Sequence, residues 1–204
     1  MQAEAIIAPA PVAAAAAAAA AATVPQDSGL ELLPLPTRGL LSFQVSRQSA
    51  GALSALRSAL GFEPPSRPNS ATSLHDVHCL WISPRHWLID SEPAAEERLF
   101  AGLAAQARAM EGTARVTRSS DCFDSVLLSG AQAASLLARG CALDLRDVAA
   151  PPNTALRTRF ADVPIILYKL RAATFRLHVD VSLSHHLWLW LADARESFDS
   201  EHGR

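Results

Sequence analysis

Ser129-Gly130, Arg139-Gly140-Cys141-Ala142-Leu143-Asp144-Leu145, Pro151-Pro152, Arg157-Thr158-Arg159-Phe160, Phe175-Arg176-Leu177 and Leu187-Trp188-Leu189-Trp190-Leu191 follow one another in the last third of the chain. This stretch decides the fold. Its glycines and prolines separate apolar runs of helical period from apolar runs of strand period. The order predicts helix, loop, hairpin, strand and helix, and it contains no arrangement of side chains typical of a catalytic site.

The elements of this second half can be placed from local patterns. Ser129 and Gln132 have the spacing of a capping box before a helix that Gly140 ends. We expect strands at 125–128, 155–160, 163–170 and 174–180, with Ala161-Asp162 as a hairpin turn, and a last helix at about 184–194. In the strand 174–180, alternation predicts Phe175, Leu177 and Val179 facing inward and Arg176, His178 and Asp180 facing outward.

The first half shows the same order of elements. Leu40–Val45 reads as a strand, Ser49 as the N-cap of a helix that ends at Gly61, and 77–82 and 86–89 as two strands joined by a turn. A second helix begins at Ser91 and Pro93 and ends at Gly112, and 114–117 forms a returning strand. The order β-α-β-β-α-β is that of a split, ferredoxin-like arrangement. We therefore predict an α+β protein built from two ferredoxin-like halves.

Composition sets the domain boundaries and excludes several classes. Residues 1–28 contain the alanine run Ala13–Ala22, which buries too little surface to hold a fold, so we predict a disordered tail there. Met1–Thr23 lacks the Lys and Arg of a secretory or transit signal, and its apolar run is too short to cross a bilayer. We predict one folded domain at 29–195 and a flexible tail at 196–204.

The charge balance argues against nucleic-acid binding. The 204-residue chain has a net charge of −2 and only 19% charged residues, with 50% hydrophobic residues. Clustered basic residues, typical of nucleic-acid surfaces, are absent. Three cysteines without paired spacing fit a reducing compartment, so we expect a cytoplasmic protein without membrane contact. The apolar excess indicates a surface that another protein covers.

Two clusters invite a chemical interpretation, and both have a simpler one. His75-Asp76-Val77-His78-Cys79 contains metal-ligand types, but no second cluster with ligand spacing completes a tetrahedral zinc site. Cys141 has no base in its pattern and is interpreted as a small buried residue after a helix. Nucleotide-binding and hydrolase motifs do not occur. The sequence therefore predicts no catalytic, cofactor-binding or metal-binding residue on this chain.

The last helix carries apolar side chains on more than one side. Its main face is predicted to contain Leu183, Leu187, Trp190, Leu191 and Ala194. Trp188 lies about 100° and Leu189 about 200° around the helix from Leu187. We predict Trp188 and Leu189 as a candidate partner interface; coverage by the N-terminal segment of the same chain is the alternative.

These residues together resemble the gamma subunit family of heterotetrameric sarcosine oxidase, which shares the aminomethyltransferase (glycine-cleavage T-protein) fold. The resemblance covers about residues 28–194. The stretches that carry it are Gly61, Pro64-Pro65, Pro68-Asn69, Leu80-Trp81-Ile82-Ser83-Pro84-Arg85-His86-Trp87-Leu88-Ile89, Leu127-Leu128-Ser129-Gly130, Leu136-Leu137-Ala138-Arg139-Gly140-Cys141-Ala142-Leu143-Asp144-Leu145, Pro151-Pro152, Arg157-Thr158-Arg159-Phe160-Ala161-Asp162-Val163 and Leu187-Trp188-Leu189-Trp190-Leu191. Arg118–Asp124 matches only loosely, and the alanine-rich leader departs from the family pattern.

The resemblance implies a non-catalytic role in a larger enzyme. Such complexes oxidise sarcosine or a similar N-methyl amine on a flavin and pass the one-carbon unit to tetrahydrofolate. FAD, FMN, NAD, tetrahydrofolate and zinc are then expected on the partner alpha, beta and delta subunits, with none on this chain. The gamma chain would support the large alpha subunit.

Two alternatives stay open. One is a stand-alone folate-binding protein of the same fold that assists iron–sulphur assembly; in that group a Lys-Gly-Cys-Tyr-x-Gly-Gln motif is expected, whereas Arg139-Gly140-Cys141 is followed here by Ala142-Leu143-Asp144-Leu145. The other is a general adaptor without an enzyme partner.

Overall fold

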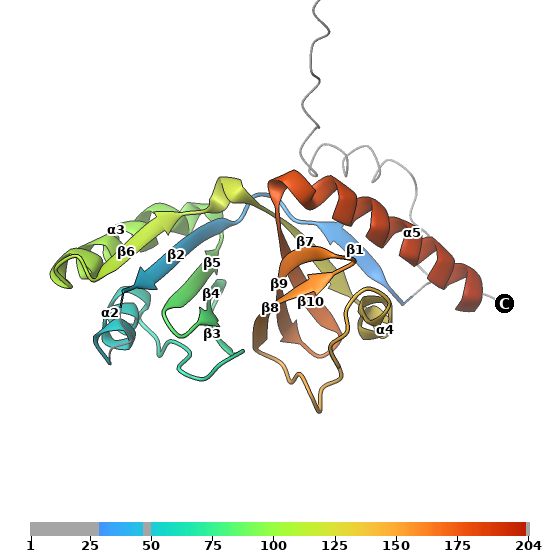
Figure 1. Ribbon diagram of the computed structural model, residues 1–204, viewed down its shortest axis with the longest axis horizontal. Coiled ribbons are helices and arrows are strands. Elements are labelled where there is room, and N and C mark those ends of the chain that lie inside the picture. The colour runs from blue at the N-terminus through green and yellow to red at the C-terminus, as the bar shows by residue number, and fades with distance from the viewer. Residues whose placement is uncertain (1–28, 47–49, 203–204) are drawn as a thin grey trace, which may run out of the picture.

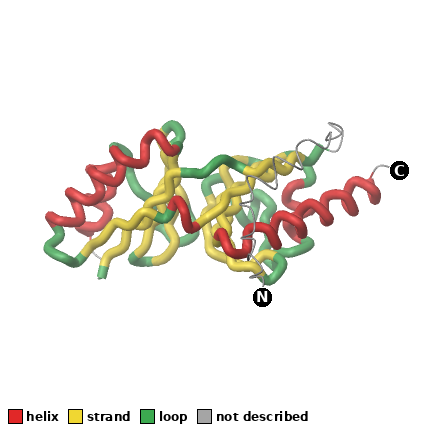
Figure 2. The backbone as a smooth tube through the Cα atoms, turned by 90° about the horizontal axis from the view of Figure 1, so that it is seen from above, coloured by secondary structure: helices red, strands yellow, loops and turns green. Residues whose placement is uncertain are grey.

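The computed structural model describes residues 29–46 and 50–202. Four layers follow one another along the long axis: helices, a five-stranded sheet, a second five-stranded sheet, and helices again (Figure 1). From above, the strands lie in the middle of the molecule and the helices toward its two ends (Figure 2). The two sheets therefore face each other, and each has its own helices on the outer side.

The first sheet has the strand order β3-β4-β5-β2-β6, and neighbouring strands pair antiparallel. Helices α2 and α3 cover its outer face, where their side chains share a core with the strands. The elements are β2 (Gly39–Val45), α2 (Ala50–Leu60), β3 (Ala71–Leu74), β4 (Val77–Ser83), β5 (His86–Ser91), α3 (Pro93–Ala109) and β6 (Ala114–Arg118).

The second sheet has the order β1-β7-β10-β9-β8, again antiparallel throughout. Helices α4 and α5 cover its outer face. The elements are β1 (Glu31–Pro34), β7 (Phe123–Ser129), α4 (Ala133–Ala138), β8 (Thr154–Phe160), β9 (Val163–Arg171), β10 (Thr174–Asp180) and α5 (Ser184–His202), with short 3-10 turns η1 (Ser120–Cys122) and η2 (Val181–Leu183).

The two sheets have equivalent strand orders, which confirms two ferredoxin-like halves. Taking β2 and β7 as the first strands, each half continues with a helix, an extra edge strand, a hairpin and a second helix. The halves differ in their last strand. In the first half it is β6, which follows α3, whereas the second sheet takes β1 from the chain before the first half.

Three apolar cores hold these layers. One lies between the first sheet and α2 and α3, and a second lies between the second sheet and α4 and α5. The third lies between the two sheets and contains Leu40, Leu80, Leu88, Ile166 and Tyr168. Because apolar side chains from both halves fill this third core, the halves form one body.

The predicted elements are present, with some boundaries shifted. Thr174–Asp180 is found as predicted, and Pro93 is the first residue of α3. The turn Ala161-Asp162 joins β8 to β9 with positive φ at both residues, the geometry of a type I′ turn. The last helix continues to His202, so the predicted end at Ala194 is too early and most of 196–204 is helical.

Other expectations require correction. Strands β1 and β3 were not predicted. The capping box of Ser129 and Gln132 does not form, because α4 begins only at Ala133 and Gln132 makes no side-chain cap. Residues 1–28 and the predicted N-cap Ser49 lie outside the described residues. None of the described helices is both long enough and apolar enough to cross a membrane.

Candidate functional site

Charged side chains meet between the two sheets, where the third core is interrupted. Asp90, near the end of β5, is fully buried and faces the second sheet. Its Oδ1 accepts a hydrogen bond of 2.8 Å from Arg38 Nε, and its Oδ2 accepts one from Arg176 Nη1 of β10. One carboxylate of the first half is thus held by a guanidinium of the second half and by one from the segment that joins β1 to β2.

The surroundings of Asp90 keep it ionised. Burial opposes the charge, but the attraction of His178, Arg176 and Arg38 outweighs it and holds the pKa of Asp90 well below its usual range. The two guanidinium groups form the hydrogen-bonded contacts. His178 Nε2 lies 3.5 Å from Asp90 Oδ2 and makes no hydrogen bond within the described residues.

Ser125, His178 and Asp90 have the order of contacts of a serine hydrolase triad. Ser125 Oγ lies 2.8 Å from His178 Nδ1, and the other ring nitrogen faces Asp90. All three side chains are buried, however, and both oxygens of Asp90 are bonded to arginines. A substrate carbonyl cannot reach Ser125 Oγ in this arrangement, so the three residues stabilise the packing of the sheets.

A second arm of the network contains two residues of the His75–Cys79 cluster. Asp76 Oδ2 accepts a hydrogen bond of 2.8 Å from Arg38 Nη2, and His78 Nδ1 lies 3.2 Å from the hydroxyl of Tyr168 in β9. Burial is the largest effect on both rings; it lowers the pKa of His78 and raises the pKa of Tyr168. This arm again joins the first half to the second.

The sulfur atoms do not belong to this network. Cys79 points to the opposite face of the first sheet, into the core with α2 and α3, where burial raises the pKa of its thiol. Cys141 is buried after α4, with its Sγ 3.9 Å from Thr158 Oγ1. Among residues 29–46 and 50–202, no three His, Cys, Asp or Glu side chains are grouped as metal ligands would be.

Lys169 of β9 holds the loop from Cys141 to Asn153 against the second sheet through two polar contacts. The Nζ of this buried lysine donates to Leu145 O at 2.6 Å and lies 2.7 Å from Asp147 Oδ1. Asp144 and Arg146 form a second, exposed pair within the loop. The loop is therefore ordered although Val148 at its tip is almost completely exposed.

The two candidate interface residues on α5 differ in their exposure to solvent. Trp188 is only 9% exposed and packs in the core between the second sheet and its helices. The expectation that it lies off the core is wrong, because this core extends farther around the helix than the predicted stripe. Leu189 is 55% exposed and stays free of the core. Leu183 and Val181 are exposed just before it.

Trp190 explains the glycine after α4. Its ring packs edge-on against Phe160, with 4.7 Å between ring centroids. Gly140 lies beneath this pair: a Cβ added there would be 2.9 Å from Phe160 ring atoms and 3.1 Å from Trp190. The Arg-Gly-Cys segment thus carries a packing requirement rather than a chemical group.

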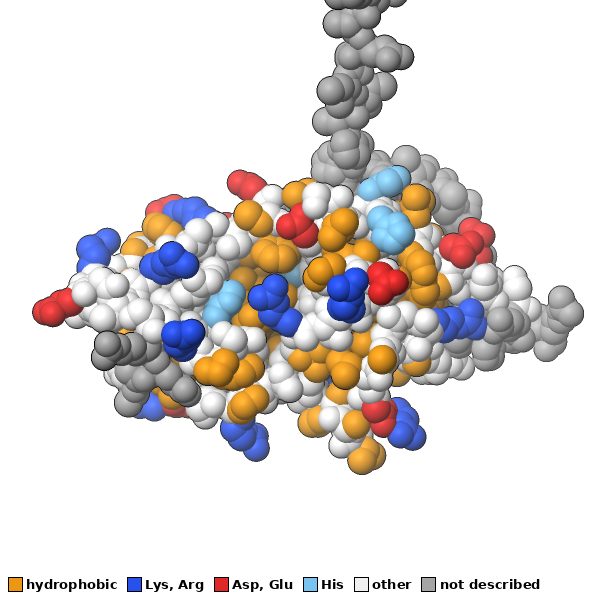
Figure 3. All heavy atoms as spheres, in the orientation of Figure 1, with side chains coloured by type: hydrophobic (Ala, Val, Ile, Leu, Met, Phe, Trp, Pro, Cys, Tyr) orange, Lys and Arg blue, Asp and Glu red, His pale blue; other side chains and the backbone are white. Residues whose placement is uncertain are grey.

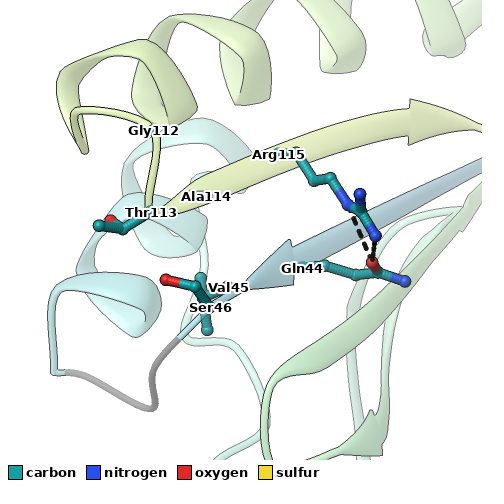
Figure 4. Close-up of a pocket in the computed structure, with 7 residues that line it drawn as sticks. All are labelled: Gln44, Val45, Ser46, Gly112, Thr113, Ala114 and Arg115. Atoms are coloured by element: carbon teal, nitrogen blue, oxygen red, sulfur yellow. Dashed lines mark hydrogen bonds between the residues drawn. The ribbon is translucent and has the colours of Figure 1, made fainter.

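Among the described residues, one pocket lies at the end of the first sheet and a smaller cavity lies on its inner face. A pocket of about 270 Å³ lies where β2 ends and β6 begins, and Figure 4 shows Arg115 reaching across it to Gln44. The Oε1 of Gln44 accepts from Arg115 Nη2 at 2.8 Å and from Nε at 3.1 Å. A smaller cavity of about 80 Å³ opens between the sheets and contacts Ser42, His86 and Arg157.

Sequence reasoning missed the buried network, and strand alternation misplaced its members. Arg176 and His178 were predicted to face solvent, but both faces of β10 are covered, one by helices and one by the first sheet. The only available indication was that polar residues of opposite charge occur in otherwise apolar strands, as Asp90 does after Trp87-Leu88-Ile89.

The sequence of this chain is similar to those of known proteins of one family. Residues 47–197 match the sarcosine oxidase, gamma subunit family. The sarcosine oxidase subunit gamma of Corynebacterium sp. strain P-1 is 29% identical over 155 residues, covering 74% of this chain and 73% of that protein. The protein of the same name from strain U-96 is 26% identical over 149 residues, covering 72% of this chain and 70% of that protein.

Solved structures agree with this placement. A chain of heterotetrameric sarcosine oxidase from Corynebacterium sp. U-96, in complex with pyrrole 2-carboxylate, superposes with a TM-score of 0.78 at 26% identity, covering 92% of this chain and 94% of that chain. Aminomethyltransferase T of the glycine cleavage system from Bartonella henselae gives 0.62 at 14% identity, covering 87% of this chain and 52% of that one. The second similarity shows a shared fold.

Proposed function

The chain belongs to the sarcosine oxidase gamma subunit family, and from this premise we propose that it is a non-catalytic subunit of a heterotetrameric sarcosine oxidase. One observation carries the proposal: the chain aligns over 94% of a subunit-sized chain from such an enzyme. The geometry favours a non-catalytic role. Ser125, His178 and Asp90 contact one another between the sheets, but they are buried in contacts that join the two halves.

The proposed complex carries out the chemistry on other chains. It oxidises sarcosine or a similar N-methyl amine and passes the one-carbon unit to tetrahydrofolate. FAD, FMN, NAD, tetrahydrofolate and zinc belong, in this proposal, to the alpha, beta and delta subunits. This chain supports the large alpha subunit in the cytoplasm.

The test is purification of the tagged chain from its native host. We expect flavin-containing subunits to co-purify in fixed ratio, identified by mass spectrometry, and the complex to produce hydrogen peroxide when sarcosine is added. The chain expressed alone should show neither flavin absorbance nor this activity. Oxidation of an N-methylated amino acid by the purified chain alone contradicts the proposal.

A stand-alone folate-binding protein is the alternative function. The similarity to aminomethyltransferase T shows only a fold that both functions share, so it does not distinguish between them. This chain spans about half of that structure. Tight tetrahydrofolate binding by a monomer that captures no flavoprotein would favour the alternative.

Leu189 remains the proposed contact residue on α5. Its side chain is exposed, whereas Leu187, two positions before it, is fully buried. We propose that Leu189→Asp weakens association with the partner subunits and leaves the thermal unfolding of this chain unchanged. Trp188→Ala serves as the matched core variant and should lower the unfolding temperature of the chain by itself.

A further inference from the structure

The inner face of the first sheet changes from buried to open in three cross-strand rows. In the first row, Leu40 and Asp90 lie opposite each other, and both are buried. In the second, Ser42 and Leu88 pair and are also buried. In the third, Gln44 pairs with His86 on one side and Arg115 on the other, and these side chains are half-buried or exposed. Because burial falls along the rows, the two sheets diverge toward the third.

The cavity of about 80 Å³ lies where the sheets begin to diverge. Its lining comes from both halves, and its apolar part consists of Ile82, Leu88, Phe123 and Ile166. A polar group lies among them, because Ser42 Oγ is 2.7 Å from His86 Nε2. The space is large enough for a small side chain and lies beside Arg157, which is exposed on β8.

The positive charges around this opening are not neutralised. Arg115 is bonded to the neutral amide oxygen of Gln44, and among the described residues no carboxylate forms an ion pair with Arg115 or Arg157. Burial is the largest effect on His86 and lowers its pKa to about 4; the charges of Arg157 and Arg115 act in the same direction. Figure 3 shows basic side chains and a histidine in the middle of this view among apolar side chains, with acidic side chains nearby.

We propose that this opening between the sheets, lined by Ser42, His86 and Arg157, with Arg115 farther along the third row, receives an aspartate or glutamate side chain from a partner subunit. Its carboxylate pairs with Arg157 and Arg115, which are arranged from two different sheets, and its aliphatic part packs on Leu88 and Ile166. Charge complementarity selects this occupant, because two guanidinium groups without a carboxylate partner near a partly apolar opening favour a carboxylate over a neutral or basic side chain. The inference rests on the proposed function for the existence of the partner.

The test uses the full chain assembled with its partner subunits. Arg157→Gln and Arg115→Gln each remove one charge while keeping a polar side chain of similar reach. We expect each to raise the dissociation constant of the chain from the other subunits by roughly tenfold, and added salt to weaken the wild-type complex more than either variant complex. Arg108→Gln is the matched control, since Arg108 is an exposed arginine on α3, on the opposite side of the first sheet.

Cross-linking identifies the occupant. Benzoylphenylalanine in place of Phe123, in the cavity wall, should cross-link after irradiation to a partner peptide that contains Asp or Glu. The same group in place of Phe100, a half-buried aromatic residue of α3, should yield no such product. Replacing the identified acidic residue of the partner with a basic residue should weaken association with the wild-type chain. Arg157→Glu should restore association with that partner variant, and it should not restore association with a partner that keeps its acidic residue.

The outcomes separate the two proposals. If the wild-type chain forms no complex with flavoprotein subunits, the proposed function fails and the partner named here fails with it. If the complex forms but Arg157→Gln and Arg115→Gln bind as Arg108→Gln does, the docking inference alone is overturned. It is also overturned if the isolated chain binds acetate to saturation and both Arg157→Gln and Arg115→Gln lose that binding equally, because the opening is then a site for small anions.

Discussion

The two halves of the molecule have the same strand order but obtain their outer strand differently. The first half takes β6 from its own sequence, directly after α3. The second half takes β1, whose Glu31 pairs with Ser129 across 98 positions of the chain. The first half contains all of its sheet between Gly39 and Arg118, whereas the second is complete only when the chain ahead of the first half has folded onto it. The second half therefore depends on contacts between residues distant in sequence, which cost more loop-closure entropy.

Asp90→Ala breaks the link between the halves and should have the largest effect. It leaves Arg176 buried without its carboxylate partner and leaves Arg38 paired with Asp76 alone. We expect a loss of about 3–5 kcal/mol in the free energy of unfolding, measured by urea denaturation of the purified chain. Asp76→Ala removes a half-exposed partner of the same Arg38 and should cost no more than about 1 kcal/mol. Equal losses in the two variants would argue against a buried link.

The same link should respond to pH. The pKa of Asp90 is lowered in the folded chain, so its stabilisation is complete above the ordinary aspartate pKa and is lost as the pH falls toward the lowered value. We expect the difference in unfolding free energy between wild type and Asp90→Asn to shrink as the pH is lowered from about 6 to about 3. A difference that stays constant over this range would show that the charge of Asp90 does not stabilise the fold.

Leu32→Ala tests the dependence of the second half on β1. Leu32 is buried in the second core and pairs with Leu128. We expect a loss of about 2 kcal/mol, near the low end for a buried leucine because β1 is an edge strand. Hydrogen exchange should accelerate in 123–129 and leave 114–118 protected. Uniform acceleration in both sheets would mean that the halves open together.

Gly140→Ala tests close packing in the second half. The added Cβ meets the rings of Phe160 and Trp190, and we expect a cost of about 1–3 kcal/mol in thermal unfolding. Trp190→Leu in the same chain should relieve part of this cost, because it removes one of the two contacts. A cost unaffected by the second change would point to another cause.

Gly102→Ala gives the opposite sign in the first half. Gly102 lies inside α3, and its added Cβ would make only ordinary contacts with Ala59 at 3.7 Å. Replacing glycine within a helix should stabilise the chain by about 0.5–1 kcal/mol, seen as a small rise in the unfolding temperature. Destabilisation there would mean that α2 and α3 pack more tightly than the Cβ distances indicate.

Local patterns predicted most elements because apolar period and turn residues act within a few positions. The hairpin around Ala161-Asp162 and the strand Thr174–Asp180 are examples. The strand β1 escaped prediction because it has only four residues, ends at Pro34 and is followed by Pro36, and because only its distant partner β7 makes it a strand. Arg176, His178 and Trp188 were misplaced for one reason: a sheet or helix buried on two sides does not show a polar and an apolar face.

The anchoring of the loop 141–153 has a chemical consequence for handling the protein. Lys169 is the single lysine of the sequence, and its ammonium is buried beneath that loop. Reagents that acylate primary amines should therefore spare the side chains of the native protein and modify only the amino terminus. The rate at which Lys169 is acylated then measures how often the loop opens, so this residue reports local unfolding.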